Sequence, residues 1–247
     1  FGMLATPASV GGRFSIFSAV GIFPLLVAGI DVKEFCRGGK EMFEQGTASD
    51  RDANCARRSA EELFIMQRSG CSILNLFYFH PELESLGKWE RQLIAESLGK
   101  EKDQKGKVVH AGITPIVSIA SADLHSMAQL YFGGPRDKFT MLISAHHDFS
   151  EKLPANGPLS GLIPGLSGKS SAEIMDAIYQ GVSAAYQAHA LPYCEVTFPA
   201  ISSYTLGAYI EWRMATVIYL AKLMNVNPFD QPNVEDYKSV TRRILAK

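Results

Sequence analysis

Continuous apolar stretches alternate with amphipathic stretches along most of the chain. Four apolar runs have the length of buried strands: CSILNLFYF at 71–79, ITPIVSIA at 113–120, KFTMLISA at 138–145 and PYCEVTF at 192–198. Helical patterns lie between or after them, at 81–98, 122–132, 170–190 and 202–224. Nearly all-apolar strands that alternate with helices are typical of a parallel sheet covered on both faces. The pattern therefore predicts an α/β fold.

The two ends of the chain carry further local signals. FGMLA at 1–5 predicts a short buried strand, and GGRFS then opens a helical stretch to about residue 28. The apolar run at 16–30 is shorter than the ~18 residues of a membrane span and contains proline, so we expect a buried helix there. Asp31 and Glu34 have capping-box spacing, which predicts a helix start. A charged helix is expected at about 52–68, and Asn233 is expected to cap a terminal helix.

Composition and charge narrow the possible functions. The chain has 247 residues, enough for one large domain or a domain with part of another, and 47% hydrophobic residues allow a sizeable core. A formal net charge of −1 provides no broad attraction for nucleic acid or for an anionic membrane. The cysteines form no CxxC pair, and no signal-peptide pattern is evident. We therefore expect free thiols and a cytoplasmic protein, although the first residue, Phe1, indicates a fragment or a processed chain.

Two short motifs could indicate other functions. GKSS at 168–171, in a Gly, Pro and Ser-rich loop at 150–171, resembles the end of a phosphate-binding P-loop, but Ile163 occupies the required glycine position. We therefore reject a P-loop. His146, His147 and Asp148 follow a predicted strand and raise the question of a metal site. Adjacent histidines on a strand point apart and no spaced third ligand is evident, which favours a loop or interface role.

The pentapeptide ESLGK occurs at 84–88 and again at 96–100, at opposite ends of one predicted helix. Gln92 and Glu96 are four residues apart, so they project from the same face near the helix C-terminus. The C-terminal end of a helix repels a carboxylate. A glutamate at position 96 is therefore expected to lower the stability of the helix slightly, as a residue retained as a catalytic base would. A solvated surface glutamate also fits the spacing.

Four separated stretches together resemble the glucose-6-phosphate isomerase (phosphoglucose isomerase) family. They are GGRFSIFSAVG at 11–21, QLIAESLGK at 92–100, ADLHSM at 122–127 and NPFDQPNVEDYK at 227–238. The resemblance implies interconversion of glucose 6-phosphate and fructose 6-phosphate, a reaction of glycolysis and gluconeogenesis, through an enediolate and without metal or organic cofactor. It also implies a three-layer sandwich of the sugar-isomerase (SIS) type with a C-terminal helix. Residues 1–30 would be the tail of a first SIS domain, and 31–247 a second SIS domain with that helix.

The resemblance further implies roles for six residues. Glu96 would be the general base, Arg13 would stabilise the enediolate, His125 and Lys238 would open the sugar ring, and Gln92 and Gln231 would contact substrate. These residue types suit the chemistry, because removing a proton next to a carbonyl requires a positioned base and a cation near the oxygen that gains charge. In the family the histidine comes from the partner subunit, which implies a homodimer. Taken singly, these side chains also fit structural or solvated positions.

The chain departs from the family pattern in three places. Asn233 and Ala221 replace signature glycines, and neither change removes a catalytic group. Family members are about twice as long and hold the substrate phosphate with an upstream Ser/Thr-rich loop that has no match here. Because that loop supplies binding energy that positions the reacting carbons, we expect this chain alone to be weakly active or inactive. The alternative is a non-catalytic SIS-type module for sugar-phosphate binding or for interaction.

Overall fold

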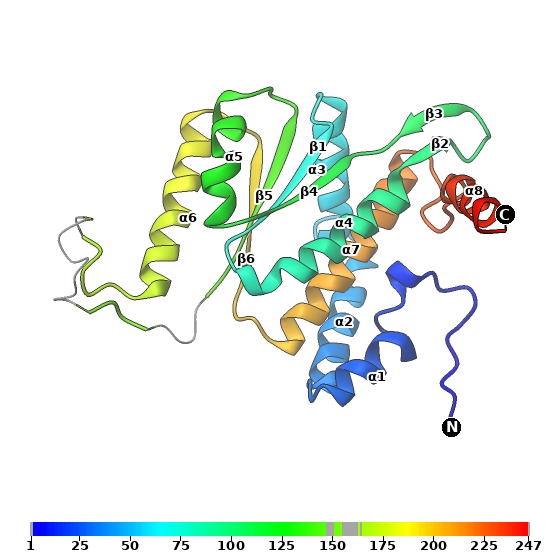
Figure 1. Ribbon diagram of the computed structural model, residues 1–247, viewed down its shortest axis with the longest axis horizontal. Helices are drawn as coiled ribbons and strands as arrows, with labels where there is room; N and C mark the ends of the chain where they lie inside the picture. Colours follow the sequence, from blue (N-terminus) through cyan, green and yellow to red (C-terminus); the bar gives the residue numbers. More distant parts are fainter. Residues whose placement is uncertain (1, 147–150, 155–162, 164, 247) are drawn as a thin grey trace. The chain divides into compact units, whose positions relative to one another are not determined.

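The four predicted strands form one sheet in the order β4-β1-β5-β6 in the computed structural model of the chain (Figure 1). The strands are β1 (Ile73–Tyr78), β4 (Thr114–Ile119), β5 (Lys138–Ala145) and β6 (Tyr193–Phe198). β5 and β6 pair in parallel, with Thr140 opposite Tyr193 and Ala145 opposite Phe198. The predicted α/β class with a parallel sheet is thus confirmed.

The structure describes residues 2–146, 151–154, 163 and 165–246. These residues divide into two compact units, which are described separately. The first unit consists of Phe1–Ile73, Lys88–Pro115 and Ser202–Lys247, and the second of Leu74–Gly87 and Ile116–Ile201. His147, Asp148 and part of the loop at 150–171 lie outside the described residues.

The second unit holds most of the sheet and two of the predicted helices, α5 (Ala122–Gly133) and α6 (Ser171–Ala188). Apolar side chains of the strands, including Phe77 and Leu142, pack against Tyr131 of α5 and Tyr186 of α6. α6 begins with a capping box between Ser170 and Glu173. The GKSS stretch therefore begins a helix through side-chain capping.

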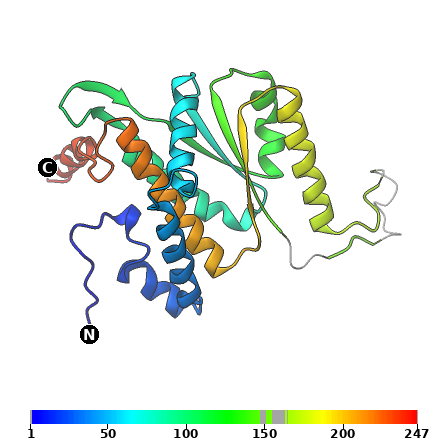
Figure 2. The same ribbon diagram turned by 180° about the vertical axis from the view of Figure 1, so that it is seen from behind.

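The first unit is built mainly from helices. The longest of them are α2 (Val32–Gly46), α3 (Cys55–Arg68), α7 (Ser203–Leu223) and the greater part of α4 (Glu84–Leu98), which follows a 3₁₀ turn at Pro81–Leu83. α2 and α7 lie side by side in both views (Figures 1 and 2). Asp31 caps α2 by accepting the backbone N–H groups of Lys33 and Glu34, as its spacing predicts.

A buried ion pair joins α4 to α7. The Nε of Arg213 lies 2.5 Å from Oε1 of Glu90, and Tyr209 donates its hydroxyl to Oε2 of Glu90 at 2.6 Å. Both charged side chains are almost fully buried. The helix that carries Glu96 is therefore anchored by charge as well as by apolar contact.

Two predictions for the N-terminal segment are wrong. Residues 2–5 form no strand and are exposed, since no neighbouring strand in the described part of this unit offers a ladder of hydrogen bonds. The run at 16–30 does form a helix, α1 (Ala19–Val27), but only Gly21 is buried in it. Phe23 and Val27 are 53% and 71% exposed, because no element in the described part of the first unit covers them.

The structure also adds features that the apolar pattern did not predict. β2 (Lys100–Lys102) and β3 (Val108–Ala111) form an antiparallel hairpin whose turn is held by the carboxylate of Asp103. The terminal helix α8 (Val234–Leu245) follows Asn233 as predicted, yet the Asn233 side chain makes no capping bond and donates to Glu101 instead. Across the described ranges, no helix is long and apolar enough to cross a membrane.

Candidate active site

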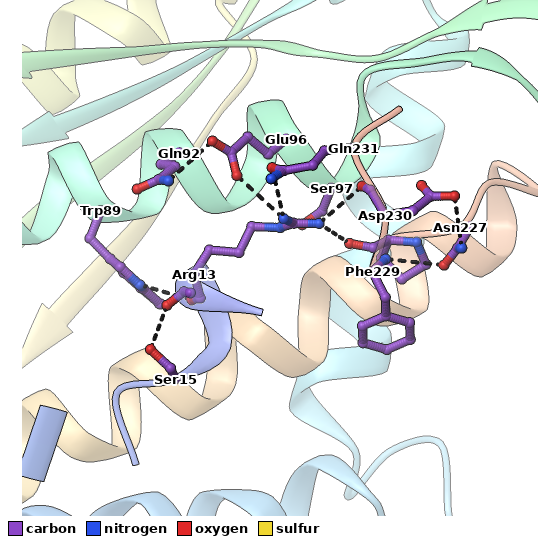
Figure 3. Close-up of polar contacts among 12 residues, drawn as sticks. Arg13, Ser15, Trp89, Gln92, Glu96, Ser97, Asn227, Phe229, Asp230 and Gln231 are labelled. Atoms are coloured by element: carbon purple, nitrogen blue, oxygen red, sulfur yellow. Dashed lines mark hydrogen bonds and ion pairs between the residues drawn. The ribbon is translucent and has the colours of Figure 1, made fainter. Parts of the chain in front are cut away.

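Arg13 is the centre of a polar cluster in the first unit (Figure 3). A short 3₁₀ helix, Gly12–Phe14, carries it, and only 3% of its side chain is exposed. Its Nε donates to the hydroxyl of Ser97 at 2.9 Å, and its Nη1 lies 3.3 Å from Oε2 of Glu96. The guanidinium is thus directed at two side chains near the C-terminal end of α4.

The segment after α7 supplies further hydrogen-bond acceptors for the guanidinium of Arg13. The Nη2 of Arg13 donates to the carbonyl oxygens of Pro228 and Asp230, and Nη1 lies 3.4 Å from Oε1 of Gln231. The backbone of Arg13 is held as well, because Trp89 of α4 donates its indole N–H to the Arg13 carbonyl at 3.1 Å. Three stretches far apart in sequence therefore meet at one cation.

Glu96 is the carboxylate that faces this cation. Gln92 donates to one of its oxygens at 3.1 Å, and Arg13 approaches the other, so both carboxylate oxygens are directed. The side chain of Glu96 is 31% exposed, whereas that of Arg13 is buried. A dissolved molecule can therefore reach the carboxylate of Glu96, whereas the guanidinium of Arg13 is buried and held by its hydrogen bonds.

The electrostatics of the pair reflect this difference in burial. Loss of solvent lowers the pKa of Arg13, and the neighbouring carboxylates of Glu96 and then Asp230 oppose that shift. An arginine nevertheless remains protonated in proteins. The site thus presents a permanent positive charge beside a carboxylate that can gain and lose a proton.

Four of the six predicted residues meet in this cluster: Arg13, Gln92, Glu96 and Gln231.

Lys238 lies on α8 and pairs with Glu235 at 2.9 Å, a hydrogen bond that raises the pKa of the lysine. Among the residues that the structure describes, no hydrogen bond or ion pair joins Lys238 to Arg13, Gln92 or Glu96. His125 is exposed on α5 of the second unit. The roles of His125 and Lys238 stay predictions.

Sequence reasoning missed three members of the site. Ser97 and Trp89 bind Arg13, and Lys100 donates to the carbonyl oxygens of Glu96 and Asp230 at 2.7 and 2.5 Å. Ser97 and Lys100 both lie in the second ESLGK, next to the candidate base, and this proximity was the available signal. Their contacts join residues up to 130 positions apart, which no sequence spacing reveals.

A cavity of about 610 Å³ borders the cluster. It is lined by residues 100–104 and 227–230 with Pro232 and Asn233, and Arg13 and Glu96 are not among its lining residues. We therefore do not place the reacting molecule in it. Within the described ranges, no group of three or more His, Cys, Asp and Glu side chains could hold a metal ion.

The arrangement as a whole is suited to proton transfer at a carbon atom. A carboxylate held by an amide can accept a proton, and a fixed cation beside it can stabilise an oxygen that becomes negative in the same step. Because the donors are in place before any reaction, little reorganisation is needed when the charge develops.

Comparison with known proteins identifies relatives along almost the whole chain. The family model "Phosphoglucose isomerase" matches residues 2–247. The glucose-6-phosphate isomerase of Pediococcus pentosaceus is 36% identical over 245 residues, covering 98% of this chain and 52% of that protein. The enzyme of the same name from Carboxydothermus hydrogenoformans is 29% identical and is covered to 53%. The chain therefore spans about half the length of the curated relatives it matches.

Solved structures show the same fold. A hypothetical protein from Thermus thermophilus superposes with a TM-score of 0.91 at 29% identity, over 98% of this chain and 57% of that one. A glucose-6-phosphate isomerase from Chlamydia trachomatis has a TM-score of 0.80 at 18% identity, over 98% of this chain and 48% of that one. The predicted parallel-sheet sandwich of SIS type is confirmed by this likeness.

Proposed function

The chain belongs to the phosphoglucose isomerase family, whose model matches residues 2–247, and from this premise we propose that it carries the proton-transfer site of a glucose-6-phosphate isomerase. The observation that supports the proposal most directly is the contact between Arg13 and Glu96 at 3.3 Å, with Gln92 on the second carboxylate oxygen. The substrates would be glucose 6-phosphate and fructose 6-phosphate in their open-chain forms.

In this proposal Glu96 moves one proton between two carbons. Its carboxylate takes the proton from C2 of the aldose, the electron pair left on C2 forms a double bond to C1, and the carbonyl oxygen becomes negative. Arg13 stabilises that enediolate oxygen by charge and hydrogen bonding. Glu96 then returns the proton to C1, and the hydroxyl proton on O2 passes to the negative O1, so that C2 becomes the ketone carbonyl and O1 becomes a hydroxyl. No electrons enter or leave, so the step needs no redox cofactor.

Ring opening and subunit assembly extend the same proposal. His125 and Lys238 would move protons between O1 and the ring oxygen of the closed sugar, and His125 would reach the site from the second subunit of a homodimer. The exposure of His125 is compatible with such a role, because a group that serves another subunit must lie at the surface. Residues 1–30 would belong to a first SIS domain and 31–247 to a second.

A binding module without turnover is the second candidate function. It is favoured by length, since the chain covers only about half of its curated relatives. A binding module has no need of a carboxylate held by an amide against a buried arginine, however. The site geometry therefore supports the isomerase better.

Conversion of fructose 6-phosphate, read through glucose-6-phosphate dehydrogenase, tests the function. The assay compares this chain with the full-length protein that contains it, and we expect turnover mainly or only in the longer form. Glu96→Gln in the longer form should lower kcat by about 10²- to 10⁴-fold, the usual contribution of a general base, and keep substrate binding.

Glu84→Gln is the matched control, because it changes the same letter in the first ESLGK copy, at the exposed start of α4. Its activity should equal that of the wild type. Equal activity of Glu96→Gln and wild type would refute the assignment of the base, and a folded full-length protein without turnover would favour the binding module.

A further inference from the structure

Lys100 is a buried cation that the chemistry above does not use. It opens β2 directly after α4, and only 4% of its side chain is exposed. Burying an ammonium group is costly unless its hydrogen bonds are satisfied. The contacts of Lys100 should therefore identify what the charge does.

The ammonium group of Lys100 joins two backbone segments. Its Nζ donates to the carbonyl oxygen of Glu96 at 2.7 Å and to that of Asp230 at 2.5 Å, and it lies 3.3 Å from a carboxylate oxygen of Asp230. The first bond satisfies a carbonyl in the last turn of α4, where helical partners are absent and a cation is favoured. The other two bonds fix the segment that follows α7.

That same segment supplies the partners of Arg13. The Asp230 carbonyl accepts from Lys100 and also from Nη2 of Arg13, at 3.3 Å. Pro228 and Gln231, on either side, provide two further acceptors for the guanidinium. A shift of Asp230 would therefore move the acceptors that aim Arg13, and a shift at Glu96 would move the carboxylate that Arg13 faces.

We propose that Lys100 is a positioning residue, whose ammonium group ties the end of α4 to residues 228–231 and so fixes the guanidinium of Arg13 against the carboxylate of Glu96. In its catalytic part this inference rests on the proposed function. Lys100 touches no reacting atom in this proposal, and it acts through the backbone of Glu96 and Asp230.

The charge balance around Lys100 agrees with a structural tie. Burial lowers the pKa of Lys100, and Asp230 opposes the shift through a hydrogen bond and through its charge. Asp230 is itself half exposed, so the pair is not sealed from solvent. Lys88, at the same place in the first ESLGK, is exposed, which shows that the sequence motif alone does not bury the lysine.

Amide hydrogen exchange on the full-length protein tests the tie without relying on turnover. Lys100→Met keeps the length of the stem and removes the charge. Exchange at the amides of Phe229, Asp230 and Gln231 should become about tenfold faster, as expected when a local hydrogen-bonded link is lost. Lys102→Met, an exposed change two residues away, should leave this exchange as in the wild type.

Steady-state kinetics test the catalytic consequence. Lys100→Met should lower kcat by about tenfold to a hundredfold, because misplacing a catalytic group costs rate. KM should stay within about twofold, since ground-state binding is not the target. A phosphorylated aldonic acid, whose carboxylate resembles the enediolate, should lose inhibitory strength in parallel with kcat. Lys100→Arg, which keeps the charge, should recover part of both losses.

The outcomes separate the two proposals. Unchanged exchange at 229–231 in a folded Lys100→Met protein would overturn the tie. If Lys100→Met does not fold, the Lys100→Arg variant is used instead. Amide exchange at 229–231 like that of the wild type then supports the tie. Faster exchange at 229–231 together with an unchanged kcat overturns the positioning role. If the wild type shows no turnover while Lys100→Met exchanges faster, the isomerase function fails and the tie stands. Equal losses of kcat in the Lys100→Met and Lys102→Met proteins would overturn the positioning role.

Discussion

Two copies of one pentapeptide show that the surroundings of a residue, and not its type alone, determine what it can do. Glu84 and Lys88 of the first ESLGK are exposed, whereas Lys100 of the second is buried and Glu96 lies against Arg13. The difference arises because the second copy ends α4 beside two other segments of the first unit. A glutamate beside a fixed cation can do chemistry that a solvated one cannot.

The buried pair of Glu90 and Arg213 makes a separate prediction for stability. Replacing Glu90 with leucine leaves the guanidinium of Arg213 buried without its carboxylate. We expect the free energy of unfolding, measured with urea, to fall by about 3–5 kcal/mol.

The double variant Glu90→Leu with Arg213→Met provides the control. Removing both charges leaves no uncompensated ion, so most of the lost stability should return. If the double variant is as unstable as the sum of the two single variants, packing and not charge dominates at this position.

Among the elements, the contact of α2 with α7 depends on two glycines. A Cβ atom added at Gly38 would lie 2.0 Å from the carbonyl oxygen of Tyr204, and one added at Gly207 would lie 2.0 Å from that of Phe35. These carbonyl groups belong to the helix backbone, which cannot move aside as a flexible side chain can. Gly38→Ala and Gly207→Ala should therefore each reduce the free energy of unfolding by about 1–3 kcal/mol or more.

Gly181→Ala is the matched control, because Gly181 lies inside α6 and an added Cβ would meet nothing within 4 Å. Its unfolding free energy should rise by about 0.5–1 kcal/mol, the difference in helix propensity between glycine and alanine. A loss of stability in this control equal to that of Gly38→Ala would contradict the steric argument.

The start of α6 predicts a pH dependence. Lys169 and then the backbone N–H of Ser170 bind the carboxylate of Glu173 and lower its pKa from 4.5 to about 2. Because the folded pKa is lower than the unfolded one, this contribution is complete above pH 4.5 and is lost as the pH falls through about 2.

Urea unfolding of the wild type and of Glu173→Gln, compared across this pH range, measures the effect. The stability advantage of the wild type should be constant above about pH 5 and should shrink steadily as the acid is added. Lys169→Met, which removes the largest cause of the shift, should move the loss to higher pH. An advantage that does not change with pH would show that Glu173 contributes through its shape and not its charge.

At the scale of the whole molecule, the proposed sharing of His125 between the subunits of a homodimer can be tested by mixing variants of the full-length protein. Mixing inactive His125→Ala with inactive Glu96→Gln should restore activity if His125 acts across the interface, since one of the two sites in each hybrid is then complete. Random mixing at equal amounts makes half the dimers hybrid, so about a quarter of wild-type activity is expected.

Glu96→Gln mixed with Gln92→Ala supplies the comparison. Gln92 and Glu96 belong to one cluster of one chain, and no exchange of subunits can restore it. Recovery should therefore be absent in this mixture. Absence of recovery with His125→Ala as well, in mixtures shown to contain hybrids, would argue that each subunit uses its own histidine.

The sequence by itself determined the four strands of the main sheet, the long helices and the family. All four strands of the sheet and every long helix follow from apolar runs, periodicity and caps, because these patterns record local burial. The four separated stretches identified the family that the family model confirms. The same reasoning placed a strand at 1–5 and buried the helix at 16–30, since an apolar segment does not reveal whether another element covers it.

Only the tertiary structure decided how the site is assembled. It showed that Ser97, Trp89 and Lys100 support Arg13 and Glu96, and that the hairpin of β2 and β3 follows α4. The bonds of Ser97 and Trp89 to Arg13 and of Lys100 to Asp230 join residues 76 to 130 positions apart, and their energies depend on distance and burial, which exist only in the folded chain. Local pattern specifies what each segment becomes, whereas the packing of distant segments determines which charges meet.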